Sequence, residues 1–427
     1  MHKYCKIFAT LALATIIKIN VSAQVKAIHF GKLVDGRGKV ITNAVVITKA
    51  GRIIAVGEEK DVTVPAGAEI INLQHYTAIP GLIDAHTHIT YYWDKTPGSN
   101  PWTQYGTLGP AVTVVLAQEN AKRALETGVT TVRDLGCNDY MDIAMRDLIN
   151  RGALVGPRIF AAGWGLHITN TTYTYGLTSR PDGGTADGIA EVQRVARQNI
   201  AAGADWIKMY ASTGSDKDVT GFQTYTYEEM KAAADVAHMA GKRIAIHTYG
   251  PGAVNDAIRA GANTIEHTTD VDDSTIANMA KSGITYVPTV DHNRYYIAHK
   301  DEYGYDSTAV AGLNNYITRN FETLKKAIKA KVKIAMGSDA VFSGFGENTY
   351  ELEWFVKAGM TPEEALKTAT VNGAEMLGKE KELGTIGVGY FADIVAVDGD
   401  PLKDINVVIH NVKWVMKDGK VVVDKTK

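Results

Sequence analysis

Eight short apolar stretches, separated by segments with helical periodicity, constrain the fold of this chain more than any other feature. The stretches are AIPGLIDAHTHI, VTTVRDLG, PRIFAAG, DWIKMYAS, RIAIHTYG, NTIEHT, TYVPTV and KIAMGSDA. Helical patterns such as QENAKRALETG and PGAVNDAIRAG lie between most of them, and several end in glycine, the residue expected just past a helix. Eight strand–helix units predict an α/β fold, a (β/α)8 barrel of the TIM type. A doubly wound open sheet is the alternative, but no Gly-rich phosphate-binding motif follows the first strand.

The two ends of the chain have a different, β-rich pattern. Residues 24–78 contain short apolar runs with Gly-rich turns between them, and residues 384–427 repeat that style. Each segment is too short to be an independent domain. We therefore predict that both pair into one small β-sandwich domain, beside a barrel formed by residues 79–383.

The first 23 residues have the pattern of a secretory signal peptide. Lys3 and Lys6 form a basic start, an apolar run follows, and Val21-Ser22-Ala23 offers small residues for cleavage. The apolar run is too short to span a bilayer as a mature helix. We therefore expect an exported protein, periplasmic or secreted, with no stable membrane insertion once the leader is cleaved. An uncleaved membrane anchor is the alternative.

Charge and cysteine content bear on partners and on stabilisation. Lys and Arg total 45 against 47 Asp and Glu, and no basic block stands out, so we expect no nucleic-acid partner. Cys5 lies in the leader and leaves Cys137 alone, so the mature chain cannot form an intramolecular disulfide. An exported protein without disulfides must rely on its core, on bound metals or on both.

The carboxyl ends of the predicted strands are rich in residue types that bind metals. In barrels of this kind, the chemistry lies at those ends. The candidate ligands at the strand ends are His86, His88, Lys208, His247, His267 and Asp339. Asp134 and Glu266 also lie near strand ends, but we do not count them among the candidate ligands. His86 and His88 are separated by one residue, so they point to the same side of a strand and make a natural chelate. Many such pairs are surface histidines, but further histidines and an Asp at the same face predict a metal centre.

Lys208 is the unusual member of this group, because it lies in the middle of an apolar strand. An unpaired ammonium in a dry interior is costly, so such a group is usually paired, neutralised or used. A side chain that reaches solvent, or that pairs with one buried acid, is the simpler interpretation.

The motifs at these strand ends resemble those of the amidohydrolase superfamily of metal-dependent hydrolases, in its imidazolonepropionase-like and Xaa-Pro dipeptidase branch. The matching motifs are PGLIDAHTH, KMYASTG, AIHTYG, IEHTT and GSDA, with GYFADIVAVDGDP near the C-terminus. In the subtype with a lysine on the fourth strand, carbon dioxide carboxylates that lysine at N6, and the carbamate bridges two divalent metals, usually zinc. The resemblance extends over about residues 25–423.

The resemblance also implies a ligand set. One metal would be held by His86, His88, Lys208 and Asp339, and the other by Lys208, His247 and His267. Neutral imidazoles and carboxylate oxygens suit zinc, with manganese, cobalt or nickel as alternatives.

A mechanism follows from the same resemblance. A hydroxide that bridges the metals attacks the scissile carbonyl, and Asp339 accepts its proton and passes it to the leaving amine. His167, after the third strand, is our candidate to polarise the carbonyl, since relatives of the Xaa-Pro dipeptidase type have a histidine there; a structural hydrogen bond is the alternative. Tyr210 lies two residues beyond Lys208 on the same face, where it either donates to substrate or packs.

Three residues are candidates for binding the substrate. His292 and Arg294 follow the seventh strand and could meet a substrate carboxylate, for which Arg offers two-pronged geometry. A solvated loop is the alternative for both. Tyr225 is the third candidate, although Thr226 and Glu229 beside it look like a capping box, which explains part of the segment by helix initiation alone.

The resemblance is closest to enzymes that release a C-terminal amino acid from dipeptides, including Xaa-Pro dipeptides, or from N-acyl amino acids. We therefore expect a binuclear hydrolase of small amide substrates. The alternatives are an amidohydrolase for a cyclic amide, as in imidazolonepropionase, or for an ester or lactone, and a non-catalytic exported binding protein. The resemblance also allows a homo-oligomer, for which the sequence offers no interface signal.

Overall fold

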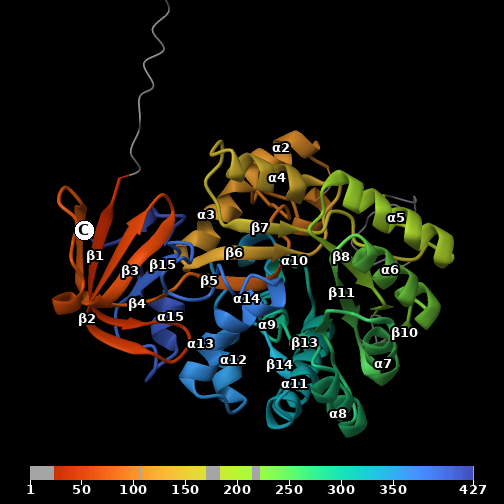
Figure 1. Ribbon diagram of the computed structural model, residues 1–427. Helices are drawn as coiled ribbons and strands as arrows, with labels where there is room; N and C mark the ends of the chain where they lie inside the picture. The colour runs from red at the N-terminus through yellow and green to blue at the C-terminus, as the bar shows by residue number, and fades with distance from the viewer. Residues whose placement is uncertain (1–23, 106, 170–182, 214–221, 427) are drawn as a thin grey trace, which may run out of the picture.

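The computed structural model describes residues 24–105, 107–169, 183–213 and 222–426 (Figure 1). The expected leader, residues 1–23, lies outside the described residues. A seven-stranded sheet lies at one side of the molecule, and parallel strands surrounded by helices make up the rest. None of the helices in these ranges is both long enough and apolar enough to cross a membrane.

Each of the eight apolar stretches contains a strand, and neighbouring strands pair in parallel. The strands are β5 (Leu82–Thr87), β6 (Val129–Asp134), β7 (Arg158–Ala161), β8 (Trp206–Tyr210), β11 (Arg243–Thr248), β12 (Thr264–His267), β13 (Thr285–Val287) and β14 (Lys333–Ile334). They form two sheets, in the orders β5-β6-β7 and β14-β13-β12-β11-β8.

Backbone hydrogen bonds link the two sheets at both margins. After β7, the Leu166 N–H donates to the Lys208 carbonyl of β8, and the Tyr210 N–H donates back to the Leu166 carbonyl, both at 2.9 Å. At the other margin, the Asp339 N–H donates to the His86 carbonyl at 2.7 Å. These links are isolated bridges rather than ladders. The architecture is therefore of the TIM-barrel type, and a continuously hydrogen-bonded ring stays a prediction.

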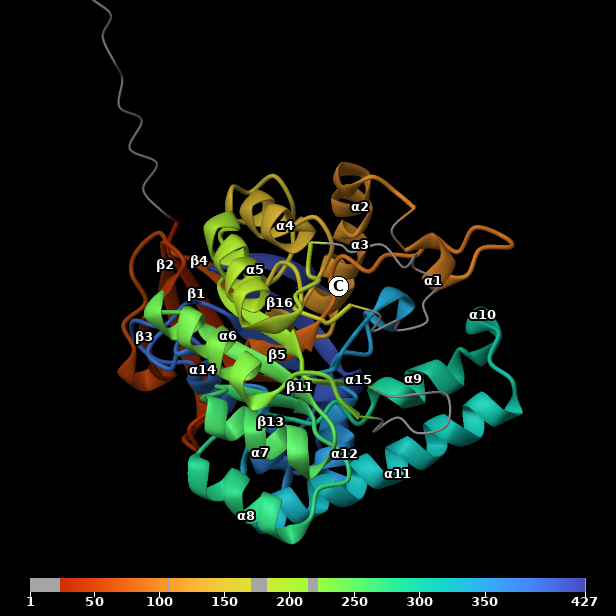
Figure 2. The ribbon, with the colours of Figure 1, turned by 90° about the vertical axis from the view of Figure 1, so that its right-hand side faces the viewer.

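Helices surround the strands (Figure 2). They are α1 (Pro101–Gln104), α2 (Pro110–Leu116), α3 (Gln118–Glu126), α4 (Met141–Asn150), α5 (Gly188–Ala202), α6 (Tyr227–Met239), α7 (Gly250–Ala260), α8 (Asp273–Ser282), α9 (His292–Ala298), α10 (Lys300–Tyr303), α11 (Ser307–Lys329), α12 (Glu351–Lys357), α13 (Pro362–Thr368), α14 (Val371–Leu377) and α15 (Asn406–His410). As expected, α7 and α8 end at glycines in the left-handed conformation, Gly261 and Gly283. The predicted capping box of Thr226 and Glu229 begins α6.

The β-rich ends of the chain form one sheet. Its strands are β1 (Lys26–Val34), β2 (Val40–Lys49), β3 (Arg52–Glu58), β4 (Glu69–Pro80), β15 (Ile394–Val397), β16 (Val412–Lys417) and β17 (Lys420–Asp424), in the order β17-β16-β15-β4-β1-β2-β3. These strands share one hydrogen-bonded sheet, and its arrangement as a β-sandwich stays a prediction. Strand β4 joins the two ends of the chain, since it pairs with β1 on one side and with β15 on the other.

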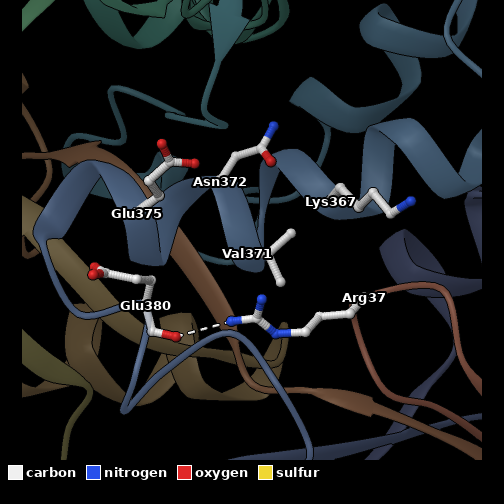
Figure 3. A pocket seen from close by; sticks show the side chains of 6 residues that line it. All are labelled: Arg37, Lys367, Val371, Asn372, Glu375 and Glu380. Carbon is white, nitrogen blue, oxygen red and sulfur yellow. Dashed lines mark hydrogen bonds between the residues drawn. The ribbon is translucent and has the colours of Figure 1, made fainter.

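A surface cavity of about 340 Å³ lies where the loop after β1 approaches α13 and α14 (Figure 3). Its lining residues are Arg37, Lys367, Val371, Asn372, Glu375 and Glu380. The Arg37 guanidinium donates to the Glu380 carbonyl at 3.0 Å. None of the candidate ligands from the strand ends lines this cavity.

Candidate metal centre

His86, His88 and Asp339 form a tight group at the carboxyl ends of β5 and β14. Nε2 of His88 lies 3.2 Å from Oδ1 of Asp339, and Nε2 of His86 lies 3.5 Å from the same oxygen. One potential ligand atom from each residue lies within 4.8 Å of the others. All three side chains are buried. Two imidazoles and a carboxylate in this arrangement can hold a divalent metal ion.

Lys208, His247 and His267 extend this group along the next strands, β8, β11 and β12. The Nζ atom of Lys208 lies 3.5 Å from Nε2 of His86. The ring centroid of His267 lies 4.9 Å from that of His86 and 4.4 Å from that of His247. The structure therefore brings all six candidate ligands together, and their role as ligands stays a prediction.

The Nδ1 atoms of His86 and His88 face hydrogen-bond acceptors of the protein. Nδ1 of His86 lies 2.9 Å from a carboxylate oxygen of Glu266, and Nδ1 of His88 lies 2.9 Å from the carbonyl oxygen of Gly136. Such contacts orient a ligating imidazole and leave its other nitrogen for the metal. Both Nε2 atoms face Asp339, so the donors present fit a metal centre.

The protonation of most of the group fits metal ligation. Burial lowers the pKa of His86, His247 and His267 well below the usual value, which leaves the rings neutral. Burial opposes ionisation of Asp339, but His292 and the other site histidines hold the pKa of Asp339 well below its usual range. His88 differs, because burial is outweighed by its hydrogen bond to Asp339, which raises the pKa of His88. Metal binding needs the neutral imidazole, so a metal ion at this group would displace a proton from His88.

Lys208 has no exposed surface, so it does not reach solvent. Burial lowers the pKa of Lys208 to about 8, against the opposing charges of Glu266 and Asp339. Its amine is therefore partly neutral near neutral pH. The aromatic ring of Tyr210 lies 4.9 Å from Nζ, and that ring also contacts His247, with centroids 5.6 Å apart. Tyr210 thus lies at the site.

The backbone at the site is strained. His267, Thr268 and Asp339 have positive φ angles of 66°, 43° and 54°. Non-glycine residues rarely occupy this region, and a β-branched residue such as Thr268 does so least of all. Strain of this kind is typical of functional sites, where the surrounding structure enforces it.

The structure separates the two candidates that follow the seventh strand. Nε2 of His292 lies 3.4 Å from Oδ2 of Asp339, so His292 reaches the site. The Arg294 guanidinium instead makes two hydrogen bonds to Asp291, at 2.7 and 2.8 Å, and a further one to Glu347. The bidentate hydrogen bonds that Arg294 could make to a substrate carboxylate are made to Asp291 instead. The structure therefore does not place Arg294 as a substrate-binding residue.

Tyr225 lies in the core rather than at the site. Its side chain is 1% exposed, and its hydroxyl donates to the Ala186 carbonyl at 2.9 Å. The expectation that Tyr225 binds substrate is therefore corrected. The residue directly precedes the capping box of α6.

His167 makes the structural contacts that we considered as the alternative to catalysis. Nδ1 lies 3.0 Å from the Gly165 carbonyl oxygen, and Nε2 lies 3.2 Å from the Thr185 hydroxyl. Both ring nitrogens thus have partners within the loop that follows β7. Its expected role at the carbonyl stays a prediction.

Sequence reasoning missed Asp84, a buried acid on β5 that lies two residues before His86. Asp84 accepts hydrogen bonds from the Ser338 N–H, the Ser338 hydroxyl and the Asn348 amide, at 2.9, 2.6 and 2.9 Å. It thereby ties the motif PGLIDAHTH to the motif GSDA, next to Asp339. An acid inside an otherwise apolar strand was the available signal, because a buried carboxylate needs such partners.

Known proteins resemble this chain in sequence and in fold. The sequence profile of the amidohydrolase family matches residues 77–422. The chain is 30% identical to ochratoxinase from Aspergillus niger over 416 residues, which cover 90% of this chain and 83% of that protein. It is 23% identical to imidazolonepropionase from Fusobacterium nucleatum subsp. nucleatum, over 92% of this chain and 95% of that enzyme. A crystal structure of a Xaa-Pro dipeptidase with methionine bound in its active site has a TM-score of 0.83 and 30% identity, and covers 93% of this chain and 99% of that one.

Proposed function

We propose a substrate class for this chain, which belongs to the amidohydrolase family and hydrolyses carbon–nitrogen bonds. In this proposal it releases the C-terminal amino acid from dipeptides or N-acyl amino acids. The observation that carries the proposal is the buried group of imidazoles, Asp339 and Lys208 at the strand ends. The substrate class is supported by similarity to a Xaa-Pro dipeptidase, a relative that holds a free amino acid, methionine, in its active site.

We propose that the group holds two divalent metal ions, with zinc favoured by its donors. His86, His88 and Asp339 would hold one ion, His247 and His267 the other, and a carboxylated Lys208 would bridge them. The lowered pKa of Lys208, about 8, supports this step. A neutral amine attacks the carbon of carbon dioxide, forms an N–C bond and loses one proton, which leaves a carbamate anion. The bound ions would supply Lewis-acid polarisation and a water of lowered pKa.

Asp339 would move the proton in the reaction. As an ionised carboxylate it can accept a proton from the attacking water and return it to the leaving nitrogen. His292 contacts its second oxygen and would hold its orientation. Tyr210 and His167 are the candidates to donate a hydrogen bond to the carbonyl oxygen as negative charge develops there.

A cluster of aromatic side chains beside the site supports a substrate with an apolar side chain. We call it the aromatic wall; its members are Tyr91, Trp102, Tyr105, Tyr295, Tyr296, Tyr303 and Phe342. The ring of Tyr91 lies 4.7 Å from that of His88, and the ring of Tyr296 lies 4.7 Å from that of His292. Rings of this kind bind apolar groups of a substrate near the reacting bond.

A substrate screen of the zinc-loaded protein tests the proposal. The panel contains dipeptides with proline or an apolar residue at the C-terminus, N-acyl amino acids, lactones and cyclic amides, scored by released amino acid or by ring opening. We expect turnover of the first two classes and a much lower rate with Asp339→Asn. Hydrolysis of lactones alone, or of cyclic amides alone, would contradict this proposal and support the corresponding alternative. Of these alternatives, the similarity to imidazolonepropionase favours the cyclic amide.

We also propose export by residues 1–23, a proposal supported by the sequence pattern alone. Amino-terminal sequencing of protein from the periplasmic or secreted fraction tests it. A mature chain that begins at residue 24 is the expected result.

A further inference from the structure

Behind the candidate ligands lies a buried group of polar side chains that the proposed reaction does not use. The side chains of Arg133 on β6 and Glu266 on β12 have no exposed surface. Nη2 of Arg133 donates to both oxygens of Glu266, at 2.9 and 3.1 Å. Nη1 of Arg133 donates to the Thr264 hydroxyl at 2.8 Å, and that hydroxyl in turn donates to Glu266. Glu266 is thus held from two directions.

Arg133 is itself fixed. Its Nε donates to the Ala85 carbonyl at 2.6 Å, and its guanidinium lies over the Trp206 ring, 4.5 Å from the centroid. A buried ion pair contributes little net stability compared with apolar residues of the same volume. Stability alone therefore does not explain why Arg133 and Glu266 are buried as an ion pair. We infer that the Glu266 carboxylate has a further role.

The Glu266 carboxylate faces a candidate ligand. Its Oε2 lies 2.9 Å from Nδ1 of His86. An ionised carboxylate can only accept a hydrogen bond, so the contact requires a proton on Nδ1. A neutral imidazole with that proton presents the lone pair of Nε2, the atom that lies 3.5 Å from Asp339 and 3.5 Å from Lys208.

We propose that Glu266 is a positioning residue, whose carboxylate, held by Arg133 and Thr264, fixes His86 in the tautomer and orientation that present Nε2 to a divalent metal ion. The inference rests on the proposed function in so far as it assumes a metal at His86. Glu266 itself is not assigned any contact with the substrate or with the metal.

Zinc affinity of the purified protein tests the proposal without reference to turnover. Glu266→Gln keeps the size of the side chain but loses the charge that accepts from Nδ1 and pairs with Arg133. We expect zinc binding, measured by competition with a chelating dye, to weaken by about 10–100-fold, the range typical of removing such a partner.

Asp393→Asn is the matched control. Asp393 is also a buried acid paired with an arginine, Arg158 at the amino end of β7, with an oxygen–nitrogen distance of 2.6 Å. This variant should lower the melting temperature and leave zinc affinity unchanged. An equal loss of zinc affinity in both variants would assign the effect to general destabilisation and overturn the role of Glu266.

Two further measurements cover a Glu266→Gln variant that does not fold. The double variant Arg133→Met/Glu266→Gln removes both charges together and should again bind zinc weakly. In a crystal structure of the zinc-loaded wild-type protein, His86 should bind zinc through Nε2 while Nδ1 contacts Glu266. Binding through Nδ1, or a His86 ring turned away from Glu266, would overturn the proposal.

The outcomes separate this inference from the proposed function. If the wild-type protein and a folded Glu266→Gln variant bind zinc equally well, only the role of Glu266 is overturned. Wild-type protein that binds no divalent metal overturns the metal centre, and with it both proposals.

Discussion

At the scale of single residues, burial decides the chemistry of Lys208. The side chain has no contact with solvent, and its pKa falls to about 8 because an ammonium loses its hydration in the core. The amine is therefore partly neutral near neutral pH, the form that the proposed carboxylation requires. The same burial keeps the neighbouring histidines neutral.

Lys208→Ala removes the proposed bridge between the metals. We expect loss of both activity and bound metal. Metal affinity should fall by more than the about 10–100-fold that is typical when a hydrogen-bond partner of a ligand is removed. Metal content by elemental analysis and turnover are the measurements. Partial recovery with added acetate or propionate, which supply a carboxylate, would support the bridge; full metal content and full rate without them would contradict it.

Asp339→Asn separates proton transfer from metal holding. The amide retains one oxygen that can contact a metal, but it cannot accept a proton. We expect much of the metal to remain while kcat falls by about 10²–10⁴-fold, the usual contribution of a general acid–base group. Wild-type rates in this variant would remove Asp339 as the proton carrier.

Tyr225→Phe tests the corrected location of that residue. The variant loses the hydrogen bond to Ala186, which costs about 0.5–1.5 kcal/mol of stability. We expect a lower melting temperature with unchanged kcat and KM. Tyr210→Phe is the matched control, since Tyr210 contacts the site and its loss should lower kcat. A raised KM in Tyr225→Phe would restore the substrate-binding interpretation.

At the scale of elements, local signals explain why helices begin and end where the sequence predicts. The Thr226 hydroxyl accepts from the Glu229 N–H at 3.3 Å, and the Glu229 carboxylate accepts from the Thr226 N–H at 2.8 Å. Strands β13 and β14 are shorter than the apolar stretches that contain them. Beyond them the chain takes positive φ at Thr289 and Asp339, which bends it into the site.

Thr226→Ala removes the N-cap of α6. We expect a loss of about 1 kcal/mol in stability, because the N–H of Glu229 loses its acceptor. Thermal unfolding followed by circular dichroism measures the change. Thr226→Ser keeps the hydroxyl and should unfold close to the wild-type temperature; equal destabilisation by Ala and Ser would contradict a capping role.

At the scale of the whole molecule, a buried acid links helix α12 to the segment between β13 and α9, which leads to His292. Glu351, at the start of α12, accepts hydrogen bonds from the N–H groups of Val290 and Asp291 at 2.9 and 2.8 Å. Burial raises the pKa of Glu351 from 4.5 to about 8. The folded protein therefore keeps a proton that the unfolded chain releases between these values.

This difference predicts a pH dependence of stability. The contribution of Glu351 is fully present below pH 4.5 and is lost as the pH rises toward about 8, because the unfolded chain binds fewer protons in that window. Relative to wild type, Glu351→Gln should therefore gain stability as the pH rises from about 5 to 8. Urea midpoints of the metal-free proteins measure this; Glu353→Gln, on the same helix, controls for loss of a carboxylate. A constant difference between Glu351→Gln and wild type would contradict the raised pKa.

The sequence by itself determined the order of strands and helices and the residue types at the strand ends. Periodicity, caps and glycine stops act within a few residues, so they can be read locally. The six candidate ligands follow from the same local pattern, since the carboxyl ends of parallel strands meet at one face.

Only the tertiary structure decided which side chains reach that face and what holds them. Arg294 pairs with Asp291, three residues before it, and with Glu347, far along the chain. Tyr225 is buried in the core, while Glu266 contacts His86. The two β-rich ends merge into one sheet for the same reason. Partners distant in sequence compete for each polar group, and that competition is settled only when the whole chain has packed.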